Sequence, residues 1–240
     1  MNIFMWSGPR NLSTALMRSF ENRNDAEVWD EPFYAYYLKE TNKDHPMANK
    51  IIQKYENDSK KIIKKIVSFE KIDKIFYQKH MTHHMLEQTN LNWISHGINC
   101  FLIRDPKDVI LSYSKKNILT DSNDIGFPMQ LKIFNMVKKF SKKIIVINAD
   151  DLSSNPKKIL QLLCKNLDIS FSEKMINWPK GERKTDGIWE SIWYNNVKSS
   201  SKFEILVKKN EKIPDQYINI YNKCLSIYQE INSYNILYER

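Results

Sequence analysis

Residues 8-GPRNLST-14 form a turn of mostly small residues between an apolar run, 3-IFMW-6, and a segment with helical character, 15-ALMRSFENR-23. A strand, a tight turn and a helix in this order are typical of a phosphate-binding loop, because the free amides at the start of the helix converge on an anion. The Walker A form of this loop ends in Gly-Lys-Ser or Gly-Lys-Thr, whereas 12-LST-14 occupies those places here. Arg10 is the only cation inside the turn. Taken alone, the stretch is equally compatible with an ordinary capped helix after a turn.

Short apolar runs alternate with helical patterns along the rest of the chain. The predicted strands, each mostly apolar and ending in polar residues as buried parallel strands do, are 3–7, 26–30, 75–81, 98–104 and 143–149. The predicted helices are 13–22, 46–70, 83–89, 106–117, 127–141, 156–167, 186–198 and 214–232. This alternation predicts an α/β protein, a P-loop-NTPase-like three-layer α/β/α domain with a mainly parallel sheet of about five strands and a helical C-terminal part. Ligands of such sheets bind outside the carboxyl ends of the strands.

The composition predicts one domain over residues 1–240, with 42% hydrophobic residues to build its core. The net charge of +9 suits polyanionic ligands, but a bias towards Lys, Ile and Asn would also follow from an A+T-rich genome, so only cations within motifs are informative. Three isolated cysteines fit neither a metal pattern nor a disulfide framework and favour a cytoplasmic protein with reduced thiols. The sequence shows no signal peptide and no membrane span. We expect no nucleic-acid partner, and the oligomeric state is open.

A second motif, 101-FLIRDPKDVILSY-113, places Arg104 at the end of a predicted strand. Asp105 and Pro106 begin the following helix, and Ser112 lies eight residues after Arg104, two turns along it. The planar fork of an arginine donates two parallel hydrogen bonds, which suits a phosphate. The same pattern also permits a simple surface salt bridge between Arg104 and Asp108.

These motifs together resemble the sulfotransferase superfamily. The segment 8-GPRNLSTALMRSF-20 resembles the 5′-phosphosulfate loop of that superfamily, and 104-RDPKDVILS-112 resembles its 3′-phosphate motif, with Arg and Ser at the same separation. The segment 144-IIVINADDLSSNPKKILQLLCKNLDI-169 is similar to the Tyr-Glu-Asp-Leu segment and its helix, and 178-WPKGERKTDGIWESIWY-194 to the Lys-Gly-x-x-Gly-Asp-Trp loop over the nucleotide. The matches keep the order of the family, and they most resemble the bacterial group whose loop reads Gly-Pro-Arg-Asn.

The resemblance implies a donor co-substrate, 3′-phosphoadenosine 5′-phosphosulfate (PAPS), and no metal, since Arg10 would supply the charge stabilisation that a metal gives kinases. The residues that it assigns to the 5′-phosphosulfate are Arg10, Asn11, Leu12, Ser13, Thr14 and Ala15. Those that it assigns to the 3′-phosphate are Arg104 and Ser112. Those that it assigns to the late loop over the nucleotide are Lys180, Gly181, Arg183 and Lys184. Two positions depart from the family: Leu12 replaces a glycine, and Ala149 stands where an adenine-contacting tyrosine is common.

The acceptor implied is a small molecule with a hydroxyl or amine that attacks sulfur in line. Glu31 follows the second predicted strand, and the resemblance implies that it is the general base. The alternative for Glu31 is a turn carboxylate paired with a lysine. His83 and His84 are competing bases, and we keep His84 as the second catalytic candidate. A metal site that also uses His80 lacks a nearby carboxylate or cysteine.

Two other functions stay open at this stage. One is a nucleotide-dependent phosphotransferase or hydrolase, which would require Mg²⁺ and is disfavoured by the missing Walker lysine. The other is a nucleotide-binding protein without transfer chemistry, which the departures at Leu12 and Ala149 keep open.

Overall fold

The core strands form because short apolar runs send alternate side chains to the two faces of a sheet. In β1 (Asn2–Ser7), Phe4 and Trp6 enter the hydrophobic core on one face, while Ile3 and Met5 enter the core on the other. All six residues of this strand are buried. A strand buried on both faces reads as a continuous apolar run, and this is why 3-IFMW-6 does not alternate with polar residues.

The computed structural model describes residues 1–68, 74–206, 208 and 210–238. Its strands form one five-stranded sheet in the order β2-β3-β1-β4-β5, and every pairing is parallel. The strands beside β1 are β2 (Ala26–Asp30), β3 (Ile75–Met81), β4 (Ile98–Ile103) and β5 (Ile145–Asn148). The predicted α/β fold with a mainly parallel sheet of about five strands is confirmed.

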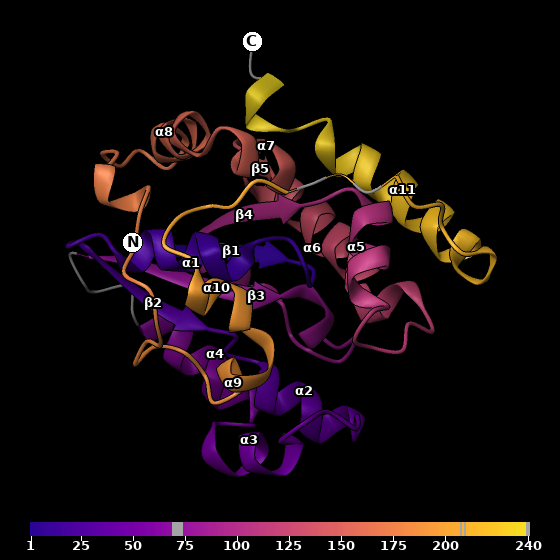
Figure 1. Ribbon diagram of the computed structural model, residues 1–240. Coiled ribbons are helices and arrows are strands. Elements are labelled where there is room, and N and C mark those ends of the chain that lie inside the picture. Colours follow the sequence, from indigo (N-terminus) through magenta and orange to yellow (C-terminus); the bar gives the residue numbers. More distant parts are fainter. Residues whose placement is uncertain (69–73, 207, 209, 239–240) are drawn as a thin grey trace.

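Helices cover both faces of this sheet (Figure 1). The helices α1 (Ser13–Glu21) and α8 (Pro156–Asn166) share one hydrophobic cluster with the strands. On the other face, a second cluster includes α5 (Pro106–Tyr113), α6 (Phe127–Phe140) and α11 (Ile218–Asn232). The short helix α7 (Ala149–Ser154) follows β5 directly. The three-layer prediction is confirmed by this arrangement.

The strand order places a crevice at the carboxyl end of β1. After β1 the chain builds β2 and β3 on one side of it, and then crosses to build β4 and β5 on the other side. At such a switch point the loops that leave neighbouring strands diverge, and ligands of open α/β sheets bind between them. The loops after β1, β3 and β4 therefore meet at one edge of the sheet.

Three predicted helices differ from the structure. The helix predicted over 46–70 is interrupted, and α3 (Ala48–Lys54) and α4 (Ser59–Ser68) replace it, because the Asp58 carboxylate accepts from the amide of Lys60 and starts a new helix. Its last residues lie in 69–73, outside the described residues. The helix predicted over 83–89 is only a 3₁₀ turn at Thr82–His84. The helix predicted over 186–198 is two short helices, α9 (Glu190–Trp193) and α10 (Asn195–Ser199).

Two helices were not predicted, and one of them is the short α7 that follows β5. The helix α2 (Tyr34–Thr41) follows β2 and buries three tyrosines in its first turn. Aromatic residues have modest helix propensity, so this helix depends on tertiary packing rather than on its own sequence. No helix in the described part of the chain is both long and apolar enough to cross a membrane.

Candidate active site

The loop after β1 opens onto a cavity of about 430 Å³. Arg10 and Leu12 both have left-handed backbone conformations, with φ of 66° and 63°. Leu12 is the residue before α1, and it makes no side-chain cap. Residues 9–15 all line the cavity, so the uncapped start of α1 faces it and its amides and dipole favour an anion there. Leu12 thus adopts the conformation that the expected glycine would have.

Because Leu12 is left-handed, glycine should be more stable than alanine at this position, the reverse of their usual order in a helix. In most helices Gly is less stable than Ala by up to about 1 kcal/mol, but at a left-handed position a side chain costs roughly 1–2 kcal/mol. We therefore expect Leu12→Gly to be more stable than Leu12→Ala by about 1 kcal/mol, although both lose the packing of the half-buried leucine. Urea unfolding of the two variants measures the difference, and an alanine variant that is equally or more stable would contradict it.

The two predicted phosphate-binding motifs, around Arg10 and around Arg104, meet in this cavity. The Nε of Arg10 donates to the Ser112 hydroxyl over 2.9 Å, and the Nη1 of Arg104 donates to the backbone carbonyl of Arg10 over 3.0 Å. All three residues line the cavity. Burial lowers the pKa of Arg10, and the charge of Arg104 lowers it further. Two guanidinium groups that disfavour each other inside one cleft form a site that an anion would stabilise.

Arg104 also lies near carboxylates, as one alternative had predicted. Its guanidinium is 3.9 Å from Asp108 and 3.7 Å from Asp150. Yet the side chain is only 10% exposed, so the contact is not a surface salt bridge. The buried Nε of Arg104 has no hydrogen-bond acceptor among the described residues. Its nearest carboxylate oxygen is the Oδ1 of Asp150, which is also buried without a hydrogen bond.

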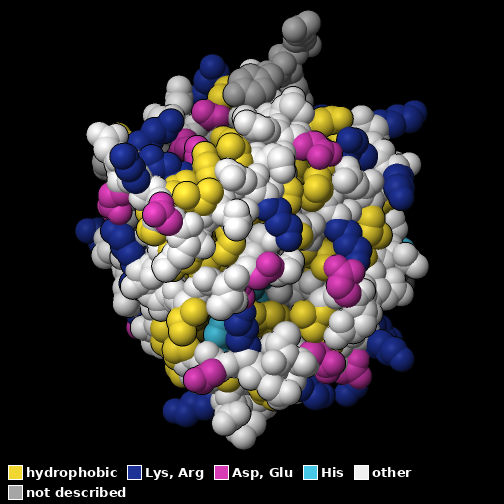
Figure 2. Space-filling view, turned by 90° about the vertical axis from the view of Figure 1, so that its right-hand side faces the viewer, with side chains coloured by type: hydrophobic (Ala, Val, Ile, Leu, Met, Phe, Trp, Pro, Cys, Tyr) yellow, Lys and Arg dark blue, Asp and Glu magenta, His cyan; other side chains and the backbone are white. Residues whose placement is uncertain are grey.

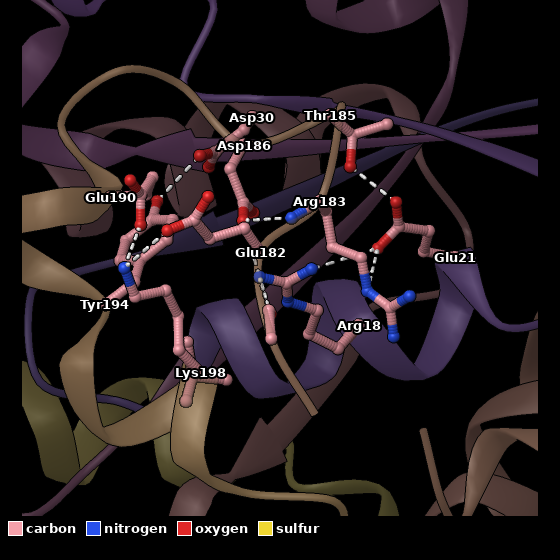
Figure 3. A network of polar contacts seen from close by, with 12 residues as sticks. Arg18, Glu21, Asp30, Glu182, Arg183, Thr185, Asp186, Glu190, Tyr194 and Lys198 are labelled. Atoms are coloured by element: carbon pink, nitrogen blue, oxygen red, sulfur yellow. Dashed lines mark hydrogen bonds and ion pairs between the residues drawn. The ribbon is translucent and has the colours of Figure 1, made fainter. Parts of the chain in front are cut away.

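The late loop predicted to cover the nucleotide lies elsewhere. Arg183 donates to the carbonyl of Pro179 over 2.9 Å and stands 3.7 Å from Glu21 on the outer side of α1 (Figure 3). Buried Arg18 holds this loop there, because it pairs with Asp186 over 2.5 Å. The four predicted residues that the structure thereby places away from the cavity lining are Lys180, Gly181, Arg183 and Lys184.

The segment that follows this loop borders the cavity instead. The residues of this segment in the cavity wall are Trp193, Tyr194, Asn196, Val197, Ser200, Lys202, Glu204, Ile205 and Leu206. Lys202 and Lys116, from the turn after α5, are cations that the sequence reasoning missed. Neither belongs to a recognisable motif, so only the fold reveals them. Figure 2 views the side towards which the strands of Figure 1 point, and histidine and hydrophobic side chains lie there in a hollow with Lys or Arg beside it.

Glu31 lines the same cavity at the end of β2. Its Oε1 is 2.6 Å from the ammonium group of Lys79, which also lies 3.0 Å from Asp30. Burial raises the pKa of Glu31, although Lys79 opposes the shift. Burial lowers the pKa of Lys79, but Asp30 and Glu31 outweigh it and raise the pKa overall. Glu31 therefore pairs with a lysine, as the alternative had predicted, and it also faces the cavity.

The sequence reasoning missed Lys79. It is fully buried in β3, where it is the only cation apart from His80 in 75-IFYQKHM-81. A lysine in the middle of a mostly apolar strand is the signal that could have found it, since lysine is rarely buried without a partner.

His84 lies beside Glu31 but is a weak base. Its Nδ1 is 3.9 Å from the Oε2 of Glu31, and its ring stacks on those of Tyr34 and Tyr37 at 4.6 and 4.8 Å. Burial lowers its pKa well below the usual range, and the neighbouring His83 adds to this effect. Burial also lowers the pKa of His83 to about 3.

His80 does not join the other two histidines. It stacks on Trp6 at 4.7 Å in the core and is not among the cavity residues. Within the described part of the chain, no group of three potential protein ligands could hold a metal ion. The metal alternative built on His80, His83 and His84 therefore has no geometric basis here.

A family profile described as "Sulfotransferase domain" matches residues 1–220 of the chain. The chain belongs to the sulfotransferase domain family. The expected resemblance is thus confirmed. Two curated relatives from Arabidopsis thaliana are named branched-chain-amino-acid aminotransferase-like proteins 2 and 1; each is 32% identical, over 94% and 97% of this chain. This sulfotransferase domain spans only about two fifths of their length, 40% and 42%.

Solved structures share the fold of this sulfotransferase domain. The sulfotransferase domain from the curacin biosynthetic pathway aligns with a TM-score of 0.60 at 16% identity, over 96% of this chain and 95% of the other. The sulfotransferase from Alicyclobacillus acidocaldarius aligns with a TM-score of 0.59 at 9% identity, over 97% and 94% of the two chains. At such identities the likeness concerns the fold, so the chemistry must be argued from this site.

Proposed function

We propose that this sulfotransferase-family protein transfers a sulfuryl group from PAPS to a hydroxyl or amine of a small acceptor. The observation that carries the proposal is the meeting of Arg10 and Arg104 in one cleft, at the uncapped start of α1. PAPS has two separate anionic groups, and this cleft offers a helix N-terminus and a pair of guanidinium groups within one cavity. Both features select anions.

The donor site would divide between these two features. The amides of residues 12 to 15, with the hydroxyls of Ser13 and Thr14, would hold the 5′-phosphosulfate. Arg104 and Ser112 would hold the 3′-phosphate. Arg10 contacts Ser112, so its charge would serve both anions. We assign to Lys202 and Lys116 the covering role that the sequence gave to Lys180, Gly181, Arg183 and Lys184.

The acceptor site would lie at the Glu31 end of the cavity. Bound PAPS supplies the sulfuryl group. Glu31 would take the proton of the acceptor hydroxyl or amine, whose oxygen or nitrogen forms the bond to sulfur as the bond to the phosphate oxygen breaks. The products are the sulfated acceptor and 3′-phosphoadenosine 5′-phosphate (PAP). Aromatic side chains at this end, among them Tyr34, Tyr113 and Trp193, favour a small and partly apolar acceptor.

The test of the donor site is calorimetry with PAP. Removing one charged hydrogen bond to a phosphate costs about 1.5–3 kcal/mol, so Arg10→Ala and Arg104→Ala should each weaken PAP binding roughly 10-fold to 100-fold. Lys180→Ala and Lys184→Ala are the matched controls, because these cations lie outside the cavity lining and should leave the affinity unchanged. Unchanged affinity in both arginine variants would refute the site.

A thermal-shift screen separates the proposal from the phosphotransferase alternative. PAP should stabilise the protein without Mg²⁺, by an amount that grows with its concentration. ADP and GDP lack the 3′-phosphate and should stabilise it less. Stabilisation by ADP or GDP that depends on Mg²⁺ and exceeds that by PAP would support the alternative.

A further inference from the structure

A buried hydrogen-bond cluster lies behind the acceptor end of the cavity. It joins Glu31 to Asp30, Lys79 and Tyr194, and all four side chains are at least 90% buried. Tyr194 comes from far along the chain, between α9 and α10, and Figure 3 shows it with Asp30. Asp30 and Lys79 belong to the neighbouring strands β2 and β3, and Glu31 directly follows β2. Tyr194 joins them from the segment that follows the late loop.

The hydroxyl of Tyr194 has a defined role in this cluster. It donates to the Oδ2 of Asp30 over 2.7 Å and accepts from the Nζ of Lys79 over 2.6 Å. It also accepts from the Nε1 of Trp189 over 3.1 Å. A phenol has one proton to donate, so the 2.7 Å contact to Asp30 takes it in preference to Glu31, whose Oε1 is 3.2 Å away.

The cluster has a consequence for Glu31. Tyr194 satisfies one oxygen of Asp30, and Lys79 bridges the other oxygen of Asp30 and the Oε1 of Glu31. Without the hydroxyl, Asp30 would lose a donor and compete more strongly for the ammonium of Lys79. The ammonium group of Lys79 would then stabilise the Glu31 carboxylate less, although Glu31 would remain as buried as before.

The same tyrosine belongs to the segment that borders the donor end. Its carbonyl accepts from the amide of Lys198 over 2.8 Å and so begins α10. Asn196, Ser200 and Lys202 follow within eight residues and line the cavity. We propose that Tyr194 is a positioning residue that ties this donor-side segment to Asp30 and keeps Lys79 available to Glu31. The inference rests on the role proposed above for Glu31.

The expected effect on Glu31 has a defined sign. The titratable groups that face Glu31 from the elements around it are Asp30, Tyr34, Lys79, His84 and Tyr194. Burial raises the pKa of Glu31, and the charge of Lys79 and its hydrogen bond to Glu31 lower it. Tyr194→Phe should therefore raise this pKa further, because Asp30 would draw the ammonium group of Lys79 away from Glu31. Asp30→Asn should lower it, because the charge of Asp30 contributes to the raised pKa.

The experiment is a ¹³C NMR titration of the full chain with labelled glutamate carboxyls, in which Glu31→Gln assigns the resonance. Tyr55→Phe is the matched control, since the Tyr55 hydroxyl accepts from the amide of Ile188, six residues before Tyr194, but lies outside the carboxylate cluster. We expect the Glu31 midpoint to rise in Tyr194→Phe, to fall in Asp30→Asn and to stay unchanged in Tyr55→Phe. An unchanged midpoint in Tyr194→Phe, or an equal rise in Tyr55→Phe, overturns the inference.

The Asp30→Asn arm keeps the test decisive if Tyr194→Phe fails to fold, because a midpoint that does not fall would contradict the proposed cluster. Where the protein transfers sulfate, the acid limb of its kcat/KM profile should move with the midpoint in each variant. Failure of the parent to release PAP from PAPS with any hydroxyl or amine acceptor would count against the proposed function. The titration would still decide the role of Tyr194.

Discussion

Glu31→Gln is expected to lower kcat for sulfuryl transfer by about 10²–10⁴-fold, the usual contribution of a positioned general base. Glutamine keeps the size of the side chain and can still accept from Lys79, so the loss would report the proton transfer rather than packing. PAP affinity should stay the same, because Glu31 contacts Lys79 and Tyr194 rather than Arg10 or Arg104. The measurement is labelled sulfate transferred from PAPS to a panel of small alcohols, phenols and amines.

His84→Asn is the informative comparison for this result. Burial lowers the pKa of His84 well below its usual range, so its imidazole is a poor proton acceptor near neutral pH. We expect a smaller loss from His84→Asn than from Glu31→Gln. The reverse order would make His84 the base. A Glu31→Gln variant that keeps the parent rate would remove Glu31 from the mechanism without affecting the donor site.

Lys79→Met is expected to lower the free energy of unfolding by about 3–5 kcal/mol at neutral pH. Lys79 bridges two buried carboxylates, Asp30 and Glu31, and removing one partner of a buried ion pair leaves uncompensated charge in the core. The pKa of Glu31 is already raised by burial, and without Lys79 it should rise further. A carboxyl with a raised folded pKa destabilises the fold above its unfolded value of about 4.3, and the loss shrinks as pH falls through the folded pKa.

Urea unfolding of the parent and Lys79→Met between neutral pH and about pH 4 tests both the size and the pH dependence. Lys74→Met is the matched control, because Lys74 lies one residue before the same strand and pairs with Glu27 at the surface, where both side chains are about half exposed. Surface pairs contribute less than about 1 kcal/mol. Equal losses in the two lysine variants, or a deficit at Lys79 that does not change with pH, would contradict this account.

The sequence by itself determined the sheet and the two motifs that carry Arg10 and Arg104. Its five predicted strands are all present; the continuous apolar runs among them became strands buried on both faces, whereas β2 lies at the edge of the sheet and is only partly buried. The motifs around Arg10 and Arg104 were also readable, since each is local: a turn and a helix start for one, a strand end and a helix for the other. The parallel order of strands then requires these ends to share an edge.

Only the tertiary structure decided which distant residues complete the site. The sequence assigned the cover of the nucleotide to Lys180, Gly181, Arg183 and Lys184, but the buried pair of Arg18 and Asp186 holds that loop against α1. The next segment borders the cavity in its place. Lys79 and Tyr194 meet Asp30 and Glu31 through contacts that span 48 to 164 positions of the chain. No periodicity or motif encodes such contacts, because residues this far apart in the chain meet only once the core has formed.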